Sequence, residues 1–172
     1  MGSVERTLKM TLATVVAILI AYQLHLDYAI SAGIIALLSV LDTRKSSLVV
    51  ARNRLLSFFL AFGIAMICFS LFGYTTLALA LYLVVTIPLL YRFGIEAGLV
   101  PITVLVTHLI AEKSIQLPVL WNECLLFFIG TGVALLFNTY MSSQDKEIRR
   151  YHQIVEDDLK AIMYRIEEFL LE

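Results

Sequence analysis

The sequence predicts an all-α, polytopic membrane protein, and three observations carry this prediction. Hydrophobic residues make up 60% of the 172 residues and charged residues only 16%, whereas soluble domains are nearer half apolar and a quarter charged. The apolar residues fall in long blocks, and lysine and arginine gather at alternate connections between those blocks. With a net charge of -1, nothing in the charge balance points to nucleic acid as a partner.

The apolar blocks predict six transmembrane helices. A helix needs about 20 apolar residues to cross the hydrocarbon core, and inside lipid each backbone polar group must be bonded within its own segment, which favours helices. The second block is short and is bracketed by aspartates. The predicted spans, which together form a transmembrane domain over residues 1–142, are Leu8–Leu26, Tyr28–Leu41, Leu55–Phe72, Thr76–Tyr91, Ile95–Ala111 and Val119–Met141.

Lysine and arginine orient the six spans. Basic residues precede the first span, fill the second and fourth connections and follow the sixth span, whereas the first, third and fifth connections contain only Lys113. By the positive-inside rule, both termini are therefore expected in the cytoplasm.

The two halves of the chain resemble each other. AGII at 32–35 aligns with AGLV at 97–100, an offset of 65 residues, and FFLAFGIA at 58–65 aligns with FFIGTGVA at 127–134, an offset of 69 residues. Three spans in each half is an odd number, so the halves would have opposite orientation. The sequence thus predicts two inverted three-helix repeats, the architecture of many secondary transporters, whose substrate sites lie where interrupted helices of the two halves correspond.

The second and fifth spans are that corresponding pair. Gly94 and Gly98 permit close approach of another helix, and Pro101 is expected to kink the fifth span near its middle and free a carbonyl. A packing kink without a ligand is the alternative interpretation. The residues that we expect along a substrate pathway are Ser31, Gly33, Glu96, Gly98, Pro101 and Asn138.

Ionisable residues inside apolar spans are costly and usually face a cavity or a partner. Glu96 lies one turn after Arg92, so an ion pair between the two is one interpretation. His108, Glu112 and Glu123 gather at the outer ends of the last two spans, either as a proton relay or as interfacial residues that reach the headgroups. As candidates for proton coupling we take Glu96, His108 and Glu123.

Basic residues crowd the predicted cytoplasmic side. Such a cluster concentrates anions by focusing the electrostatic field, and it would equally bind anionic lipid headgroups. We predict an anion-attracting mouth formed by Arg44, Lys45, Arg52, Arg54 and Arg92.

The composition changes after Met141, where polar residues become frequent. Ile148, Val155, Ile162 and Phe169 recur every seven residues, a heptad pattern that requires a partner to bury its stripe. We expect residues 143–172 to be the start of a cytoplasmic helical region, and because the chain stops within the pattern, we expect that region to be truncated.

Four stretches of the sequence carry a family resemblance: RTLKMTLATVVAILIA, SAGIIALLSVLDTRKSSL, EAGLVPITVLVTH and NECLLFFIGTGVALLFNTYMSS. They resemble the membrane domain of the bacterial aromatic acid exporter family, which belongs to the broader fusaric-acid-resistance-like membrane proteins; plant malate channels are also related. The resemblance implies six spans with internal termini in the bacterial inner membrane, a helical cytoplasmic C-terminal domain, dimers, and export of aromatic carboxylates.

We therefore expect a membrane transporter that exports organic anions from the cytoplasm. A passive anion channel and a non-transporting scaffold that acts through its cytoplasmic helix are the alternatives. The sequence shows no nucleophile–base pair, metal-ligand spacing or nucleotide-binding loop, so it predicts neither an enzyme nor a bound cofactor or metal. The expected partners are small organic anions, membrane lipids and a second copy of the chain.

Overall fold

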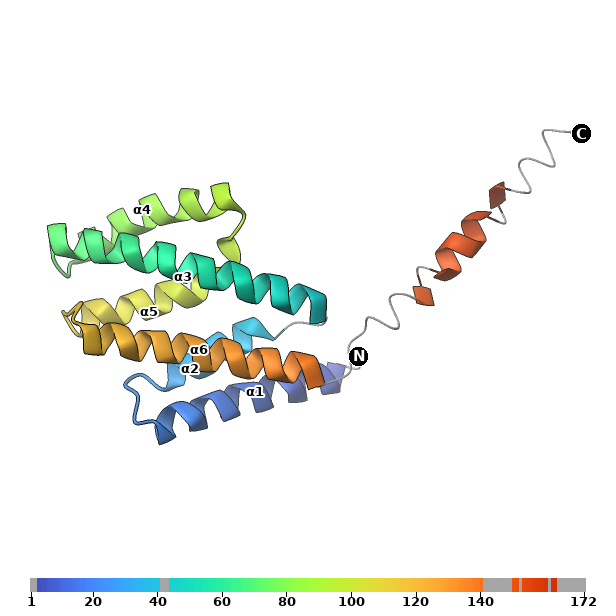
Figure 1. Ribbon diagram of the computed structural model, residues 1–172, viewed down its shortest axis with the longest axis horizontal. Helices are drawn as coiled ribbons and strands as arrows, with labels where there is room; N and C mark the ends of the chain where they lie inside the picture. The colour runs from blue at the N-terminus through green and yellow to red at the C-terminus, as the bar shows by residue number, and fades with distance from the viewer. Residues whose placement is uncertain (1–2, 41–43, 141–149, 152, 161, 164–172) are drawn as a thin grey trace, which may run out of the picture.

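The computed structural model describes residues 3–40, 44–140, 150–151, 153–160 and 162–163 of the chain. Within these residues all regular structure is helical, which confirms the predicted all-α class. The elements, labelled in Figure 1, are α1 (Ser3–Gln23), α2 (Ile30–Ser39), α3 (Arg44–Phe72), α4 (Thr76–Phe93), the 3-10 turn η1 (Glu96–Gly98), α5 (Leu99–Ala111) and α6 (Leu117–Tyr140).

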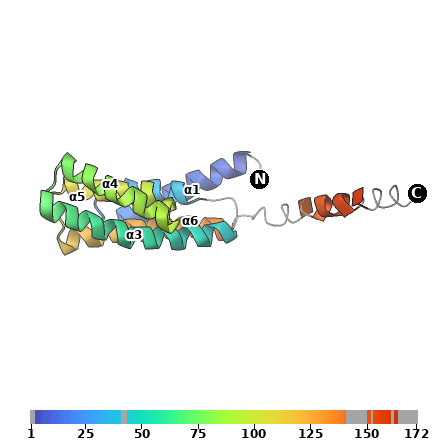
Figure 2. The same ribbon diagram turned by 90° about the horizontal axis from the view of Figure 1, so that it is seen from above.

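Successive helices of the bundle run in alternating directions along one long axis (Figures 1 and 2). They pack as two groups that do not follow the order of the chain. The helix α6 packs mainly on α1 and α2, and these three form the first group; α3 packs mainly on α4, η1 and α5, which together form the second group. The third helix of each sequence half thus packs against the other half. The two polar clusters described below lie at the interface between these groups, which we call the group interface.

Three of the described helices are long and apolar enough to cross a membrane, namely Leu48–Phe72, Thr76–Phe93 and Leu117–Thr139. Shorter apolar helices cover Thr7–Gln23, Ile30–Ser39 and Glu96–Ala111. Many large apolar side chains face outward, among them Leu71 and Val84, as lipid-facing residues do. The structure is that of a membrane protein, while the six crossings and the inverted repeat stay predictions.

The third helix begins eleven residues before the predicted span, at Arg44 instead of Leu55. At about 1.5 Å per residue, its 29 residues exceed the roughly 30 Å of a hydrocarbon core. The basic stretch predicted as a connection is therefore largely helical, and Arg52 and Arg54 project from α3. This register buries Arg54 and leaves Arg52 exposed.

Small residues bring the helices of the first group close together. The face of α1 that packs inward carries Ala13, Ala17 and Ala21, all fully buried and spaced one turn apart. A Cβ added at Gly130 of α6 would lie 2.6 Å from the carbonyl oxygen of Ala32 in α2. Without hydrophobic force between helices in lipid, such close packing holds membrane helices together.

The interruption of the fifth span differs from the prediction. The break is the 3-10 turn at Glu96–Gly98, and Pro101 follows in the first turn of α5, where an absent N–H costs nothing. Pro101 is therefore the third residue of α5 and lies where a helix tolerates proline, and the expected kink near the middle of the span was wrong. Gly98 is needed for packing, because a Cβ there would lie 2.4 Å from Cβ of Ser57 in α3.

The described part of the C-terminal region is helical, as the heptad pattern predicts. Its apolar residues Val155, Leu159 and Ile162 are more than half exposed, and Lys160 pairs with Glu156 at 2.9 Å along the helix. Ile148 and Phe169, which complete the predicted stripe, lie outside the described residues.

Candidate functional site

Buried polar side chains gather in two clusters, one near each end of the group interface. We call them the His108 cluster and the Arg54 cluster after the ionisable residue at the centre of each. Among the described residues, those that are both polar and buried in these clusters are Ser31, Ser39, Arg54, Ser57, His108, Glu123 and Asn138. Buried polar groups in a membrane bundle require partners, so these contacts define how the two groups are held together.

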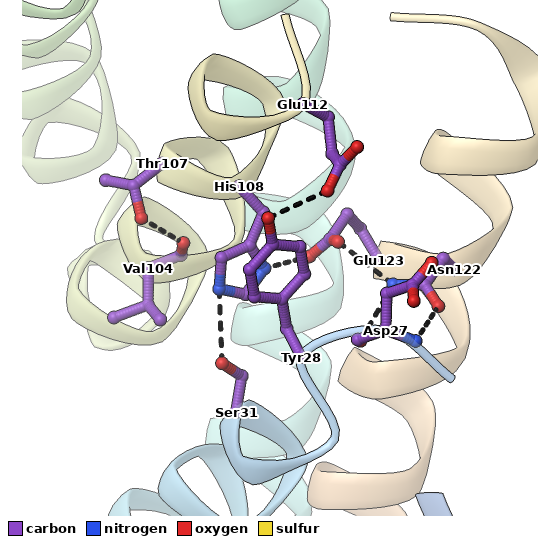
Figure 3. A network of polar contacts seen from close by, with 9 residues as sticks. All are labelled: Asp27, Tyr28, Ser31, Val104, Thr107, His108, Glu112, Asn122 and Glu123. Carbon is purple, nitrogen blue, oxygen red and sulfur yellow. Dashed lines mark hydrogen bonds and ion pairs between the residues drawn. The ribbon is translucent and has the colours of Figure 1, made fainter. Parts of the chain in front are cut away.

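The centre of the His108 cluster is a chain of three side chains that crosses the group interface (Figure 3). Nδ1 of His108 in α5 lies 2.7 Å from Oε2 of Glu123 in α6, and Nε2 lies 3.2 Å from Oγ of Ser31 in α2. Glu123 is only 1% exposed. A carboxylate only accepts hydrogen bonds, so with Glu123 ionised the ring carries its proton on Nδ1, and Ser31 donates to Nε2 of a neutral ring.

Tyr28 covers one face of the His108 ring. Its ring stacks on that of His108 with centroids 4.2 Å apart and planes 8° from parallel, and its hydroxyl donates to Oε1 of Glu112 at 2.8 Å. That hydrogen bond raises the pKa of Tyr28, because it stabilises the protonated phenol beside a carboxylate. Tyr28 also has a positive φ of 56°, which is uncommon for a residue other than glycine, so these contacts hold a strained connection in place.

Asn122 ties Glu123 to the connection between α1 and α2. Its amide nitrogen donates to Oε1 of Glu123 at 3.1 Å and to the carbonyl of Asp27 at 3.1 Å, while its amide oxygen accepts from the backbone N–H of Asp27 at 2.9 Å. Both carboxylate oxygens of Glu123 are thus bonded, and the buried carboxylate is held in one orientation.

The order serine, histidine, carboxylate is also that of hydrolase triads. Such a triad needs free backbone N–H groups near the serine to hold an oxyanion. Here the N–H groups of Ser31 and Ala32 already donate to the carbonyls of Tyr28 and Ala29. The arrangement is suited to taking up one additional proton, which the 2.7 Å contact would share between an imidazolium of His108 and a carboxylic acid of Glu123.

The Arg54 cluster joins α2, α3 and η1 near the other end of the interface. Nε of Arg54 donates to the carbonyl of Ala97 at 3.0 Å, and one terminal nitrogen donates to the carbonyl of Leu38 at 2.7 Å. The other terminal nitrogen donates to the hydroxyl of Ser39. Asn138 in α6 donates to the carbonyl of Ser39 at 3.1 Å, which adds the sixth helix to the cluster.

Ser57 and Asn53 extend this cluster along α3. The hydroxyl of Ser57 contacts the carbonyls of Asn53 and Ile95, and the side chain of Asn53 donates to the carbonyl of Gly94 at 3.3 Å. The bonds to Gly94 and Ile95 attach α3 to the backbone of the break between α4 and α5.

The guanidinium of Arg54 is buried, with 6% of the residue exposed, yet every acceptor that it contacts is neutral. Among the described residues, no ion pair includes it. A small cavity of about 10 Å³ adjoins it, with Ser39, Thr131 and Asn138 as further polar lining residues. This volume is close to the smallest that holds one water molecule. The hydroxyl of Thr131 is buried there without a hydrogen-bond partner.

Between the two clusters, aromatic side chains close the group interface. The rings of Phe58 in α3 and Phe127 in α6 stack with centroids 4.7 Å apart, and Phe62 packs beside Phe58 at 4.4 Å. Phe58 lies one turn after Arg54, and Phe127 lies one turn after Glu123. Because α3 and α6 run in opposite directions (Figure 1), the two polar clusters are separated along the bundle by about 12 Å, the rise of two four-residue steps.

The structure brings together some of the residues predicted as a site and separates others. His108 and Glu123 meet, and Ser31, predicted for the pathway, contacts His108. Glu112 bonds to Tyr28 instead of joining the relay. Gly33 is buried against Ile18 of α1, and Pro101 is buried in the first turn of α5.

The predicted cytoplasmic mouth is only partly assembled. Arg52 and Arg92 are exposed, as a mouth requires, but Arg54 is buried. For Arg44 and Lys45 the structure describes the backbone only, so their side chains are not placed. Glu96 is exposed and makes no ion pair with Arg92 in the described part of the chain, so the interpretation of Glu96 as an ion-pair partner of Arg92 is not supported.

Sequence reasoning missed Tyr28, Ser39, Ser57 and Thr131. A signal for Ser39 was present: α2 has ten residues, and its two serines, Ser31 and Ser39, are eight positions apart, which places both near one face of a helix. Thr131 carries no such signal, since a single hydroxyl in a membrane helix ordinarily bonds to its own backbone.

Comparison with known proteins gives a family match over most of the chain. Residues 1–141 match the family described as "Aromatic acid exporter family member 1". A curated protein of Bacillus subtilis (strain 168), named "Uncharacterized protein YqjA", is 37% identical over 166 residues, which cover 96% of this chain and 52% of that protein. The chain thus spans about half the length of this relative. No solved structure matches the present chain.

Proposed function

Because the chain belongs to the aromatic acid exporter family, which confirms the resemblance read from its sequence, we propose that it exports organic anions, aromatic carboxylates in particular, from the cytoplasm. The route that we propose is the group interface, opened alternately at the Arg54 cluster and at the His108 cluster. The family supports a membrane exporter that is not an enzyme, and the substrate class and the direction are our proposal.

The observation that carries this proposal is the placement of Phe58 and Phe127. The repeat predicted from the sequence aligns these two residues at an offset of 69, and they stack on each other at the group interface. A two-fold axis in the membrane plane makes equivalent residues meet where it passes through the protein. The contact therefore supports two inverted repeats related by an axis near this aromatic pair.

The same offset places Arg54 and Glu123 at equivalent positions of α3 and α6. Each is a buried ionisable residue one turn before the stacked phenylalanine, and the two lie on opposite sides of it. Equivalent positions thus carry opposite charges, a cation near one end and a proton-binding carboxylate near the other. This asymmetry fits a transporter that binds an anion on one side and a proton on the other.

The charge bias of the chain suggests which end faces the cytoplasm. The Arg54 cluster lies near the ends of α2, α4 and α6 that are adjacent to the basic connections, so by the positive-inside rule we place it on the cytoplasmic side, with both termini. Exposed Arg52 and Arg92 would then attract anions toward it. We further propose that a second copy of the chain completes a dimer.

Flux measurements in liposomes test this function. Purified protein would be reconstituted, and uptake of radiolabelled benzoate would be followed with and without an imposed pH gradient; we expect saturable flux that the gradient accelerates. The proposal would be overturned by an equal flux of a cationic aromatic amine. It would also be overturned if no benzoate flux were seen either with or without the pH gradient. Large benzoate currents without dependence on the pH gradient would indicate an anion channel instead.

A further inference from the structure

We propose that Arg54 binds the carboxylate of the transported molecule, in the small cavity that it shares with Thr131 and Asn138. This inference rests on the proposed export of organic anions and names the site where the anion is held.

The first argument is the unbalanced charge of Arg54. Moving an ion out of water costs several kcal/mol unless an opposite charge or a full set of hydrogen bonds compensates it. A guanidinium has five N–H donors, and the structure provides acceptors for three of them, the carbonyls of Leu38 and Ala97 and the hydroxyl of Ser39. Two N–H groups and the positive charge are left for a ligand.

The second argument is the unused hydroxyl of Thr131. Its Oγ1 is buried without a hydrogen-bond partner, although a threonine in a helix can bond to the carbonyl one turn earlier, as Thr103 and Thr139 do. Thr131 lines the same cavity as Arg54 and Asn138. An arginine fork together with a hydroxyl matches the acceptor positions of one carboxylate.

The size of the cavity determines how binding proceeds. At about 10 Å³ the cavity has room for a water molecule but not for a carboxylate, so the described state is closed. An entering carboxylate would bond to the two unused N–H groups of Arg54, and because it needs more room than the cavity has, it would displace the carbonyl of Leu38 from the guanidinium. Bonds between two charged groups are stronger than bonds to neutral carbonyls, which favours this exchange.

This replacement couples binding to opening. The bond from Arg54 to Leu38 joins α3 to α2 and therefore joins the two groups. Releasing it loosens the group interface at this end, while the His108 cluster at the other end is untouched. The anion would thus unlock the end from which it enters.

Binding to the purified protein tests this site. The probes are benzoate and its neutral, nearly isosteric amide, benzamide, measured by calorimetric titration in detergent. We expect benzoate to bind at least tenfold more tightly than benzamide. The decisive variant is Thr131→Val, which keeps the shape of the side chain and removes a hydroxyl that has no partner in the closed state. Its folding should be unaffected, while its benzoate affinity should fall about tenfold or more, the loss expected for a hydrogen bond to a charged group.

The matched control is Thr86→Val. Thr86 in α4 is also a fully buried threonine, but it does not line the Arg54 cavity, so its variant should bind benzoate as the wild type does. In Arg54→Gln, benzoate binding should fall at least a hundredfold, to the level of benzamide. If this variant does not fold, Thr131→Val decides the test.

Two results would overturn the inference. If Thr131→Val binds benzoate as tightly as Thr86→Val does, the carboxylate is held elsewhere, and the proposed export stands whenever the wild type still transports benzoate. If the wild type binds benzoate no better than benzamide and carries no benzoate flux, the proposed function and this site fail together.

Discussion

The contact of Gly130 with α2 allows a quantitative prediction about the packing of the first group. In Gly130→Ala the new Cβ would lie 2.6 Å from the backbone oxygen of Ala32 and 2.7 Å from Cβ of Ile35. Ordinary contacts begin near 3.4 Å, so the oxygen is about 0.8 Å too close. A backbone atom cannot rotate away, and α2 and α6 must separate.

The expected magnitude is the difference of two terms. Overpacking of a close-packed contact costs about 1–3 kcal/mol, whereas replacing glycine by alanine inside a helix gains about 0.8–1 kcal/mol. Gly130→Ala should therefore be destabilised by up to about 2 kcal/mol. Gly132, two residues further along α6, has no atom within 4 Å of an added Cβ, so Gly132→Ala should be unchanged or stabilised by up to about 1 kcal/mol.

Thermal unfolding in detergent, followed by the signal of Trp121 or by circular dichroism, compares the two variants. For a chain of this size, 1 kcal/mol corresponds to a shift of about 2–4 °C in Tm, so the midpoints of Gly130→Ala and Gly132→Ala should differ by several degrees. Equal midpoints, or a higher midpoint for Gly130→Ala, would show that α2 and α6 do not approach as described.

The other predictions concern the His108 cluster. Glu123→Gln keeps the shape of the side chain but cannot hold the proton shared with His108. We expect a loss of about 1–2 kcal/mol in stability and a benzoate flux that no longer responds to a pH gradient. An unchanged response to the gradient would show that Glu123 takes no part in the coupling. Tyr28→Phe removes the hydrogen bond to Glu112. Since that bond raises the pKa of Tyr28, the stability it contributes is fully present below the ordinary tyrosine pKa of about 10 and is lost as pH rises through the folded-state value. Denaturation should therefore separate wild type from Tyr28→Phe at pH 8 but not well above pH 10, whereas Tyr22→Phe should match wild type throughout; a gap that persists at high pH would contradict this assignment.

Among the site residues, those of the His108 cluster were predictable in part. A histidine and a glutamate inside apolar segments stand out in the sequence, because placing an ionisable group in a membrane costs free energy unless the group has a partner. The contact with Ser31 and the stacking of Tyr28 could not be predicted, since they depend on how the α1–α2 connection folds back over α5.

Arg54 was found in the sequence for the wrong reason. Counted as one of several basic residues at a membrane surface, it is indistinguishable from Arg52. Because α3 is already helical at these positions, Arg52 and Arg54 lie about 200° apart around its axis, so the face that buries Phe58 also buries Arg54 and leaves Arg52 exposed. The early helix start therefore gave Arg54 a helical position, and the packing of that helix face made it a buried charge.

The sequence by itself determined the helical class, the membrane setting and the family, because these follow from composition and from patterns along the chain. Tertiary structure alone decided that α3 and α6 exchange partners between the halves, that Phe58 meets Phe127, and that Arg54 is buried beside an unpartnered hydroxyl. The physical reason is that a membrane helix is apolar on the faces that contact lipid as well as on those that contact other helices, so hydrophobicity does not distinguish them. Which faces turn inward is settled only by the close fit of small residues and by the pairing of buried polar groups between helices.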